Sequence, residues 1–322
     1  MAAMLVFFAR STRMVLSEGK IAKSRKALIR FRGRKGQQRV QRRVQGGVNV
    51  EQPPRFDEKA ARRVEAVYAS KEEVRQRAFV MDALAPLTGE RIVDIGSGPG
   101  YVLRDLGEAV GPSGGAVGVE PAGAMIALAR RRCAGLAQVT LREGNAEAVP
   151  AGDGEFDAAI VTQVYEYVPG IAAALGELRR VLRPGGRAVI FDTDWDSLVW
   201  NARDPARAGR ILKAWDAHLA DPHLPRTLSA RLREAGFEIQ RRDVYPILNP
   251  EYEPGSYSFG MIGIIVPFVI RFGDLPKEEV KAWAAELEEL GRAGEYFFSL
   301  NRYLFVCKKP VCKKPEKNPE EK

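Results

Sequence analysis

The chain has 322 residues, of which 45% are hydrophobic and 28% are charged, a composition typical of globular proteins. This composition excludes a chain that is disordered or fibrous throughout, and the length suits one large α/β domain with additions or two average domains. The net charge of +9 is concentrated at one end: residues 1–50 hold 13 of the 50 Lys and Arg but only one of the 41 acids, so they carry +12 and the remainder −3.

The cysteines and the apolar runs indicate a reducing compartment and no membrane span. Cys133, Cys307 and Cys312 are too few for a disulfide framework, and their spacing is not that of a zinc site, so we expect no metal. The apolar runs at 5–9 and 259–270 are shorter than a signal-peptide core or a spanning helix requires. We expect a cytoplasmic protein, or an organellar one if the basic N-terminus is a transit peptide.

Composition and apolar spacing divide the chain into six parts. These are a basic arm that we expect to be disordered (1–52), N-terminal helices (53–90), a core (91–245), a cap insertion (246–300), a last strand (301–309) and a disordered tail (310–322). An RNA-binding extension, a transit peptide and translated sequence upstream of the true start all remain open for the arm.

From residue 91 onward, short β-branched runs alternate with helical stretches. This alternation implies right-handed crossovers and a parallel sheet covered on both faces, so we predict an α/β, Rossmann-like fold with a mostly parallel seven-stranded sheet. Ser70 is placed to cap a helix before the core, and residues 183–186 read as a turn. We expect strands at 91–95, 116–120, 139–143, 156–161, 187–192, 237–246 and 301–307, and helices at 101–110, 122–133, 171–182, 206–219, 228–235 and 276–292.

The segment from Arg91 to Gly100 combines a buried strand, a glycine-rich turn and the start of a helix. Glycines permit positive φ and let a ligand lie against the backbone, and the helix that follows presents free N–H groups. Glu120 ends the next predicted strand, where a carboxylate accepts hydrogen bonds from ribose hydroxyls. The Gly-x-Gly-x-Gly spacing, and Asp94 before the first glycine, favour a cationic sulfonium cofactor over a pyrophosphate-containing dinucleotide.

Four stretches of the sequence resemble one family closely. They are VDIGSGPG (93–100), VGVEPAGAMIALAR (117–130), GNAEAVPAGDGEFDAAIVTQVYEYVPG (144–170) and LRRVLRPGGRAVIFD (178–192). The chain resembles a class I S-adenosylmethionine-dependent methyltransferase of the ubiquinone/menaquinone-biosynthesis type, also called the type 11 methyltransferase family. The resemblance is strong from about 91 to 192 and looser from 56 to 310.

This resemblance implies a set of residues that bind S-adenosylmethionine. Asn145 stands where the family usually has Asp, and its side-chain carbonyl can still accept a hydrogen bond from the adenine amino group. Tyr167 replaces a common histidine, which removes the obvious general base. The expected cofactor-binding residues are Asp94, Gly96, Ser97, Gly98, Gly100, Glu120, Pro121, Met125, Asn145, Ala146 and Gln163.

The catalytic residues stay open at this stage, because displacement at an activated methyl carbon needs alignment more than a base. Candidates at the carboxyl ends of strands are Tyr165, Asp192 and Asp194, with Glu166 and Trp195 also facing the substrate. Tyr68, Tyr257 and Tyr303 line the pocket or, as we favour, pack in the core. We expect structural or exposed roles for His218 and His223.

We therefore predict methyl transfer from S-adenosylmethionine to a small organic molecule. An RNA-directed methyltransferase or RNA-binding protein that uses the basic arm is one alternative, and a cofactor-binding protein without turnover is another. The apolar run at 257–272 is expected to form a cap over the substrate end of the cofactor, with Phe259 and Ile262 in it, although a purely structural role remains open. The sequence leaves the acceptor atom and the oligomeric state undecided.

Overall fold

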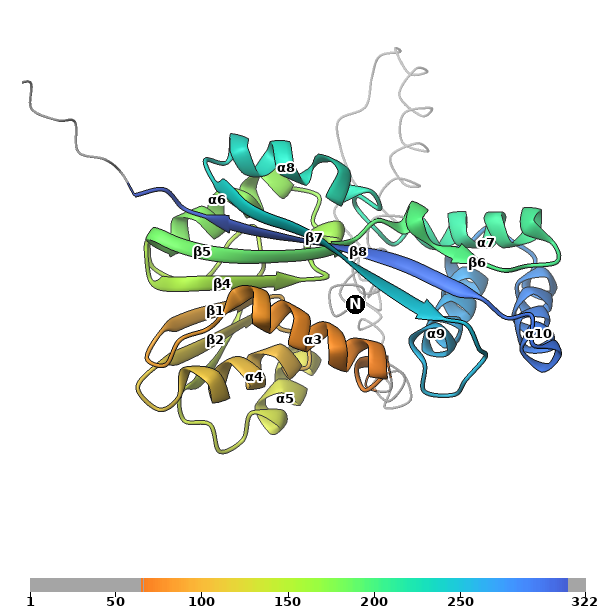
Figure 1. Ribbon diagram of the computed structural model, residues 1–322, viewed down its shortest axis with the longest axis horizontal. Helices are drawn as coiled ribbons and strands as arrows, with labels where there is room; N and C mark the ends of the chain where they lie inside the picture. Colours follow the sequence, from red (N-terminus) through yellow and green to blue (C-terminus); the bar gives the residue numbers. More distant parts are fainter. Residues whose placement is uncertain (1–64, 66, 312–322) are drawn as a thin grey trace, which may run out of the picture.

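In a computed structural model, the structure describes residues 65 and 67–311, and its helices and strands alternate along most of that range (Figure 1). The expected arm at 1–52 and the tail from 312 lie outside the described residues. The helices are α3 (Lys71–Leu84), α4 (Tyr101–Val110), α5 (Gly123–Arg132), α6 (Ile171–Val181), α7 (Pro205–Asp216), α8 (Leu224–Glu234), α9 (Tyr257–Phe272) and α10 (Lys277–Ala293). The strands are β1 (Arg91–Ile95), β2 (Gly115–Glu120), β3 (Val139–Glu143), β4 (Phe156–Thr162), β5 (Leu182–Thr193), β6 (Val199–Trp200), β7 (Glu238–Asn249) and β8 (Phe298–Lys308).

The strands form one mixed sheet, and its parallel part is the predicted core. The order is β3-β2-β1-β4-β5-β8-β6, with β7 on the other edge of β8. Pairing is parallel from β3 to β5 and antiparallel wherever β8 is involved. The Rossmann-like fold is therefore confirmed, but the expected strand number of seven is wrong, since the two-residue strand β6 makes the sheet eight-stranded.

Helices cover both faces of this sheet because its central strands are buried on both sides. Side chains of α3 and α4 pack with Ile92, Ile160 and Phe191 on one face. Side chains of α6 and α8 pack on the second face with Val93, Val161 and the other strand residues that point to that side. Alternate residues of one strand thus enter different cores, as the two-residue period of a strand requires.

Several element limits differ from the sequence expectation for identifiable reasons. Residues 183–186, expected as a turn, belong to the start of β5, because Lys309 exchanges backbone hydrogen bonds with Gly185 and Gly186. The strand β7 ends at Asn249 and β8 begins at Phe298, so both extend into the range expected for the insertion. The Ser70 cap is as expected, since its side chain accepts a hydrogen bond from the Glu73 amide.

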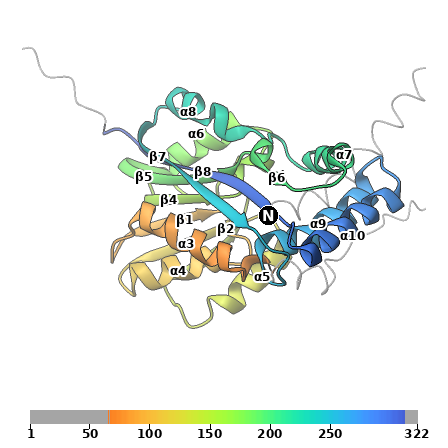
Figure 2. The same ribbon diagram turned by 45° about the vertical axis from the view of Figure 1, so that its right-hand side comes forward.

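The helices α7, α9 and α10 form a second apolar cluster beyond the parallel strands. The long β7–β8 pair connects the two regions, which is visible in both ribbon views (Figure 1, Figure 2). Ile265 and Val269 of α9 are fully buried there together with Trp215 and Trp283. The apolar run thus has an interior of its own, made with neighbouring helices.

His218, for which we expected a structural or an exposed role, is fully buried in this cluster. The rings of Tyr167, Trp195, Trp215 and Phe268 surround it. Its Nδ1 contacts the Trp215 carbonyl oxygen, and burial lowers the pKa of the imidazole to about 3. Of the two expected roles His218 has the structural one, because aromatic residues from four separate segments of the chain enclose it.

This histidine predicts a loss of stability on acidification. The ring is neutral in the folded protein, so its contribution is complete above the unfolded pKa near 6.5 and falls as the pH drops toward 3. Between pH 6.5 and 5 we expect at most about 2 kcal/mol of the free energy of unfolding to be lost through this group. Urea unfolding at both pH values should show a smaller loss in His218→Phe than in the natural protein, and an equal loss in the two contradicts the assignment.

Candidate functional site

The turn between β1 and α4 is held in a conformation that only glycines adopt without strain. Gly96, Gly98 and Gly100 have φ of 77°, 52° and 83°. A Cβ on Gly96 would lie 2.4 Å from a Val164 side-chain carbon, and one on Gly100 would lie 2.8 Å from Ala129. The glycines therefore also let the turn approach α5 and the segment that follows β4 closely, while the amides of Gly96 and Ser97 donate to the Val119 carbonyl.

Glu120, the last residue of β2, holds this turn from the side. Its Oε2 accepts a hydrogen bond from the Gly98 amide and its Oε1 accepts one from the Ala122 amide, both at 3.0 Å. The carboxylate is 1% exposed, and desolvation raises its pKa despite these two bonds. Each oxygen keeps a second acceptor position for a ligand hydroxyl.

The residues expected around an adenine ring lie at the ends of β2 and β3. Glu120 pairs in register with Glu143, which brings the segments after both strands together at one edge of the sheet. Pro121 and Asn145 are exposed, whereas Met125 and Ala146 are buried. The Asn145 Oδ1 accepts a hydrogen bond from the Glu147 amide, so this oxygen already stabilises its own loop.

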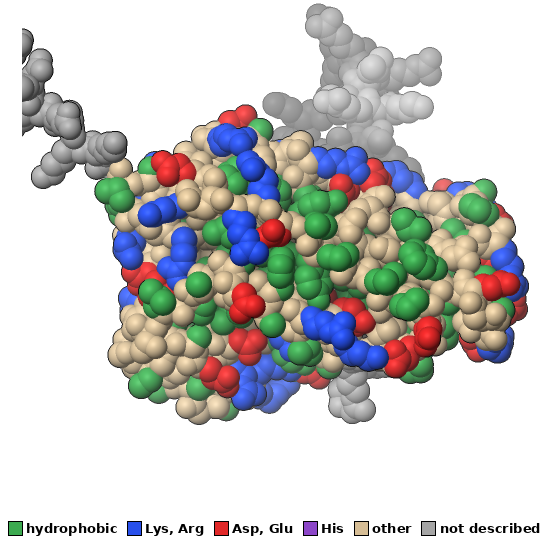
Figure 3. Space-filling view, viewed as in Figure 1, with side chains coloured by type: hydrophobic (Ala, Val, Ile, Leu, Met, Phe, Trp, Pro, Cys, Tyr) green, Lys and Arg blue, Asp and Glu red, His purple; other side chains and the backbone are tan. Residues whose placement is uncertain are grey.

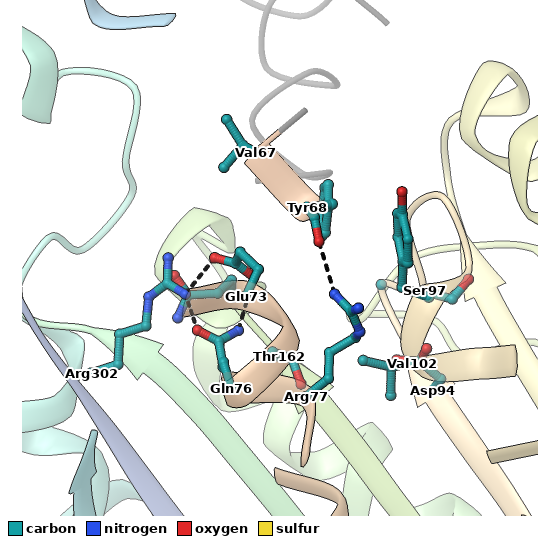
Figure 4. A pocket seen from close by; sticks show the side chains of 13 residues that line it. Val67, Tyr68, Glu73, Gln76, Arg77, Asp94, Ser97, Val102, Thr162 and Arg302 are labelled. Atoms are coloured by element: carbon teal, nitrogen blue, oxygen red, sulfur yellow. Dashed lines mark hydrogen bonds and ion pairs between the residues drawn. The ribbon is translucent and has the colours of Figure 1, made fainter. Parts of the chain in front are cut away.

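A pocket joins the glycine turn to α3 and β8 (Figure 4). It contains four of the expected cofactor-binding residues, Asp94, Gly96, Ser97 and Gln163. The expected adenine-side residues are outside it. Its other lining residues, none of them expected as cofactor-binding, are Val67, Tyr68, Glu73, Gln76, Arg77, Tyr101, Val102, Thr162 and Arg302.

Buried polar atoms without a protein partner gather around this pocket. Within the described part of the chain, they include Asp94 Oδ2, Ser97 Oγ, Thr162 Oγ1 and Arg302 Nε, all on lining residues. An unsatisfied buried polar group costs about 1–3 kcal/mol, so such a group of atoms indicates a polar ligand. The pocket thus has the chemistry of a binding site as well as its shape.

Asp94 makes the turn side of the pocket favourable for a cation. The side chain is 2% exposed, and desolvation, with a smaller effect of Glu120, raises its pKa to about 8. A nearby positive charge reverses this effect because it stabilises the ionised carboxylate. Asp94 is therefore a buried carboxyl that a neighbouring cation would stabilise in its ionised form.

Gln163 lies where β4 and β5 end, next to this turn. Its φ of 55° is positive, which is uncommon for a residue other than glycine. Its Oε1 accepts a hydrogen bond from Thr193 Oγ1 at 2.7 Å, and its backbone amide donates to the Phe191 carbonyl. These bonds fix the position of the Gln163 side chain in the pocket wall.

The three catalytic candidates, Tyr165, Asp192 and Asp194, do not line this pocket. Tyr165 and Asp192 are fully buried, and the Asp192 Oδ1 accepts a hydrogen bond from the Val164 amide. Asp194 caps the short helix at Trp195–Ser197 and forms an ion pair with Arg226. These contacts hold the ends of β4 and β5 in place.

Other candidates also have structural contacts. Glu166 is fully buried, and its Oε2 accepts hydrogen bonds from the Trp195 indole and the Thr193 amide. His223 lies 3.3 Å from Asp194. Tyr257 is buried in the α9 cluster and Tyr303 packs at the edge of the core, whereas Tyr68, for which we favoured core packing, lines the pocket and stacks on Tyr101.

The expected cap does not cover this pocket in the described structure. No α9 residue lines it: Phe259 packs on Tyr252, and Ile262 lies in the cluster with α7 and α10. The helix instead supports the pocket wall from behind, since Gly260 abuts Val67 and Tyr257 contacts Arg302.

Two sequence signals pointed to the pocket residues that we missed. Glu73, Gln76 and Arg77 are three and four residues apart, so they share one face of α3. Arg302 alternates with Leu300 and Leu304, which places an arginine on a buried face of β8. Neither signal shows by itself that the two segments meet.

Comparison with known proteins assigns the family. Residues 92–186 match the model of a methyltransferase domain. The chain is 32% identical over 187 residues to 2-phytyl-1,4-naphtoquinone methyltransferase of Thermosynechococcus vestitus, covering 53% of this chain and 82% of that enzyme. It is 33% identical over 138 residues to demethylmenaquinone methyltransferase of Lactococcus lactis, covering 42% and 55% of the two chains.

One relative aligns over a longer stretch of this chain and is uncharacterised. An uncharacterised 37.1 kDa protein of a Streptomyces fradiae transposon is 32% identical over 238 residues, which cover 72% of this chain and 66% of that protein. The chain thus spans somewhat less than two thirds of this relative and about half of the Lactococcus enzyme.

Solved structures agree in fold. The YcgJ protein of Bacillus subtilis has a TM-score of 0.51 at 18% identity, covering 74% of this chain and 99% of its own. A Haemonchus contortus phosphoethanolamine N-methyltransferase has a TM-score of 0.51 at 16% identity, covering 80% and 58%. Because the matching domain contains the glycine turn, and because most of the Thermosynechococcus enzyme aligns, this chain belongs to the class I S-adenosylmethionine-dependent methyltransferases of the ubiquinone/menaquinone-biosynthesis type.

Proposed function

We propose that this protein transfers a methyl group from S-adenosyl-L-methionine, the cofactor of its family, to a small organic acceptor. The pocket beside the glycine turn is the main support. Asp94 Oδ2 and Ser97 Oγ are buried there without a partner among the described residues, beside the turn that the three positive-φ glycines form. The residues present therefore fit this cofactor.

When bound, the cofactor supplies a methyl group on a positively charged sulfur. We assign binding to the β1–α4 turn and charge compensation to Asp94, whose carboxylate is stabilised by a cation. Glu120 orients the turn and offers acceptor positions for ribose hydroxyls. Val67 and the inner face of α3 close the pocket and exclude water from it.

Alignment is the main chemical contribution that we assign to this chain. Tyr165, Asp192 and Asp194 lie outside the pocket, and each has a contact or a burial that suits a supporting role. Displacement at an activated carbon is accelerated mainly by the correct approach of the nucleophile. We therefore propose that these three residues position the strand ends and do not exchange protons with the acceptor.

The class of acceptor is tested with radiolabelled S-adenosylmethionine and a cell extract separated into small molecules, RNA and protein. We expect label in the small-molecule fraction, as in the reactions for which the two quinone methyltransferase relatives are named. Label in RNA that is lost on deletion of residues 1–52 would support the RNA-directed alternative. Cofactor binding without label in any fraction would support a protein without turnover.

The face of the described chain shown in Figure 3 gives the RNA alternative no added support. Basic and acidic side chains are interspersed there with apolar ones, without one large basic patch. RNA-binding surfaces concentrate Lys and Arg, because neutralisation of phosphates supplies most of their affinity. We therefore place the small-molecule acceptor first.

Replacement of Glu120 should weaken cofactor binding. Glu120→Ala removes two hydrogen bonds that hold the turn and the acceptor for the ribose, so we expect a loss of about 1.5–3 kcal/mol by calorimetry. Glu143→Ala is the matched control, since Glu143 is exposed at the same level of the next strand. A loss of equal size in both variants would remove Glu120 from the site.

Asp94 should release a proton when the cofactor binds. With a pKa of about 8 the carboxyl is mostly protonated at pH 7, and a cation placed beside it lowers that pKa. Calorimetry in two buffers of different ionisation enthalpy should detect up to about one more proton released by the natural protein than by Asp94→Asn. The variant also corrects for protons from the cofactor's own amino group, and equal release would rule out direct charge compensation by Asp94.

A further inference from the structure

Arg302 occupies the end of the pocket away from the glycine turn. It lies opposite Thr193, the last residue of β5, in the β5–β8 register. In open α/β sheets, ligands bind outside the carboxyl ends of the parallel strands, and this register places Arg302 at that edge. In Figure 4, Glu73 and Gln76 stand between Arg302 on one side and Asp94 and Ser97 on the other.

The Arg302 guanidinium is held rigidly but incompletely satisfied. The side chain is 1% exposed, Nη1 contacts Glu73 Oε1 at 2.7 Å and also Gln76 Oε1, and Nη2 donates to the Tyr257 hydroxyl at 2.8 Å. Its Nε has no hydrogen-bond partner among the described residues. A buried arginine that lines a pocket and whose Nε–H has no partner among the described residues is prepared to bind an acceptor atom.

The charges around the pocket are already paired. Glu73 neutralises Arg302, and Asp105 lies 3.7 Å from the Arg77 guanidinium. Asp94, which has no basic partner here, is assigned to the cationic cofactor. Arg77 and Arg302 are the basic residues among the described lining residues, and both face an acid. A charged carboxylate at Arg302 would therefore meet the field of Glu73 and lose its hydration.

We propose that Arg302 is the residue that selects and positions the methyl acceptor, by donating its Nε–H to an uncharged oxygen of that molecule. The inference rests on the proposed function, because it assigns the far end of the cofactor pocket to the acceptor. Tyr68 and Tyr101 also line this pocket and stack on each other with ring centroids 5.5 Å apart, so part of its wall is aromatic. Arg302 thus determines specificity through one hydrogen bond, from a guanidinium that is already paired with Glu73 to an uncharged oxygen of the acceptor.

The test uses three small probes that share one ring: 4-fluorophenol, fluorobenzene and 4-fluorobenzoate. Their binding to the full-length protein saturated with S-adenosylhomocysteine is followed by ¹⁹F NMR. We expect the phenol to bind about tenfold more tightly than fluorobenzene, the effect of one hydrogen bond to a charged donor, and more tightly than the benzoate. Equal binding of phenol and fluorobenzene, or tightest binding of the benzoate, overturns the proposal.

Arg302→Lys separates the free donor from the charge. Lysine keeps a cation beside Glu73, so the buried pair is retained, but it has no N–H at the position of Nε. We expect the phenol preference to fall to within about twofold. Arg187→Lys is the matched control, since Arg187 forms a similar pair with Glu90 on β5, outside the pocket residues, and should keep the preference.

A second variant covers the case in which Arg302→Lys does not fold. The double substitution Glu73→Gln with Arg302→Met removes both charges together, which avoids an unpaired buried charge. It should also lose the phenol preference, measured on protein that is shown by calorimetry to bind S-adenosylhomocysteine. A preference retained in either variant contradicts the role of Arg302. A natural protein that fails to bind S-adenosylhomocysteine contradicts the proposed function itself, and with it an acceptor role for Arg302.

Discussion

The carboxylate of Glu120 is the contact on which the geometry of the site depends. It ends β2 and accepts hydrogen bonds from Gly98 and Ala122, so one buried acid joins the glycine turn of β1 to the start of α5. A turn with three positive-φ glycines has little rigidity of its own, because glycine loses more conformational freedom on folding than other residues. The bonds to Glu120 and the close approach to Val164 supply the order that the glycines lack.

A second polar network fixes the opposite wall of the pocket. Glu73 and Gln76 on α3 contact Arg302 on β8, and Glu72 accepts hydrogen bonds from Asn249 and from the Tyr257 amide. This network ties α3 to the β7–β8 pair and to the first turn of α9. Buried polar groups are costly unless every partner is present, so the wall forms only when these segments meet together. The helices beyond the sheet therefore matter to the site as support.

The pocket combines two different electrostatic environments. Near the turn, the raised pKa of Asp94 marks a carboxyl that a cation would stabilise. Near β8, Arg302 is neutralised by Glu73, so that end offers directed donors without net charge. The two ends of the pocket thus differ in the charge of the groups that line them.

Local patterns in the sequence determined the chemistry of the turn and most of the core. β1, α4 and β3 have the expected bounds, and Asp94, Gly96, Ser97 and Gln163 come together in one pocket. Strand and helix periodicity, and glycine placement, are properties of short segments, so they can be read without the fold. The same patterns placed Tyr165, Asp192 and Asp194 at strand ends but did not show which way these side chains are buried.

Only the tertiary structure decided what lies opposite the turn. Glu73 and Arg302 are 229 positions apart, and no spacing rule relates two segments so distant. The enclosure of His218 by rings from four segments, and the packing of α9 against α7 and α10, are decided in the same way. Burial and pairing of polar side chains depend on which elements become neighbours, and that information belongs to the folded chain as a whole.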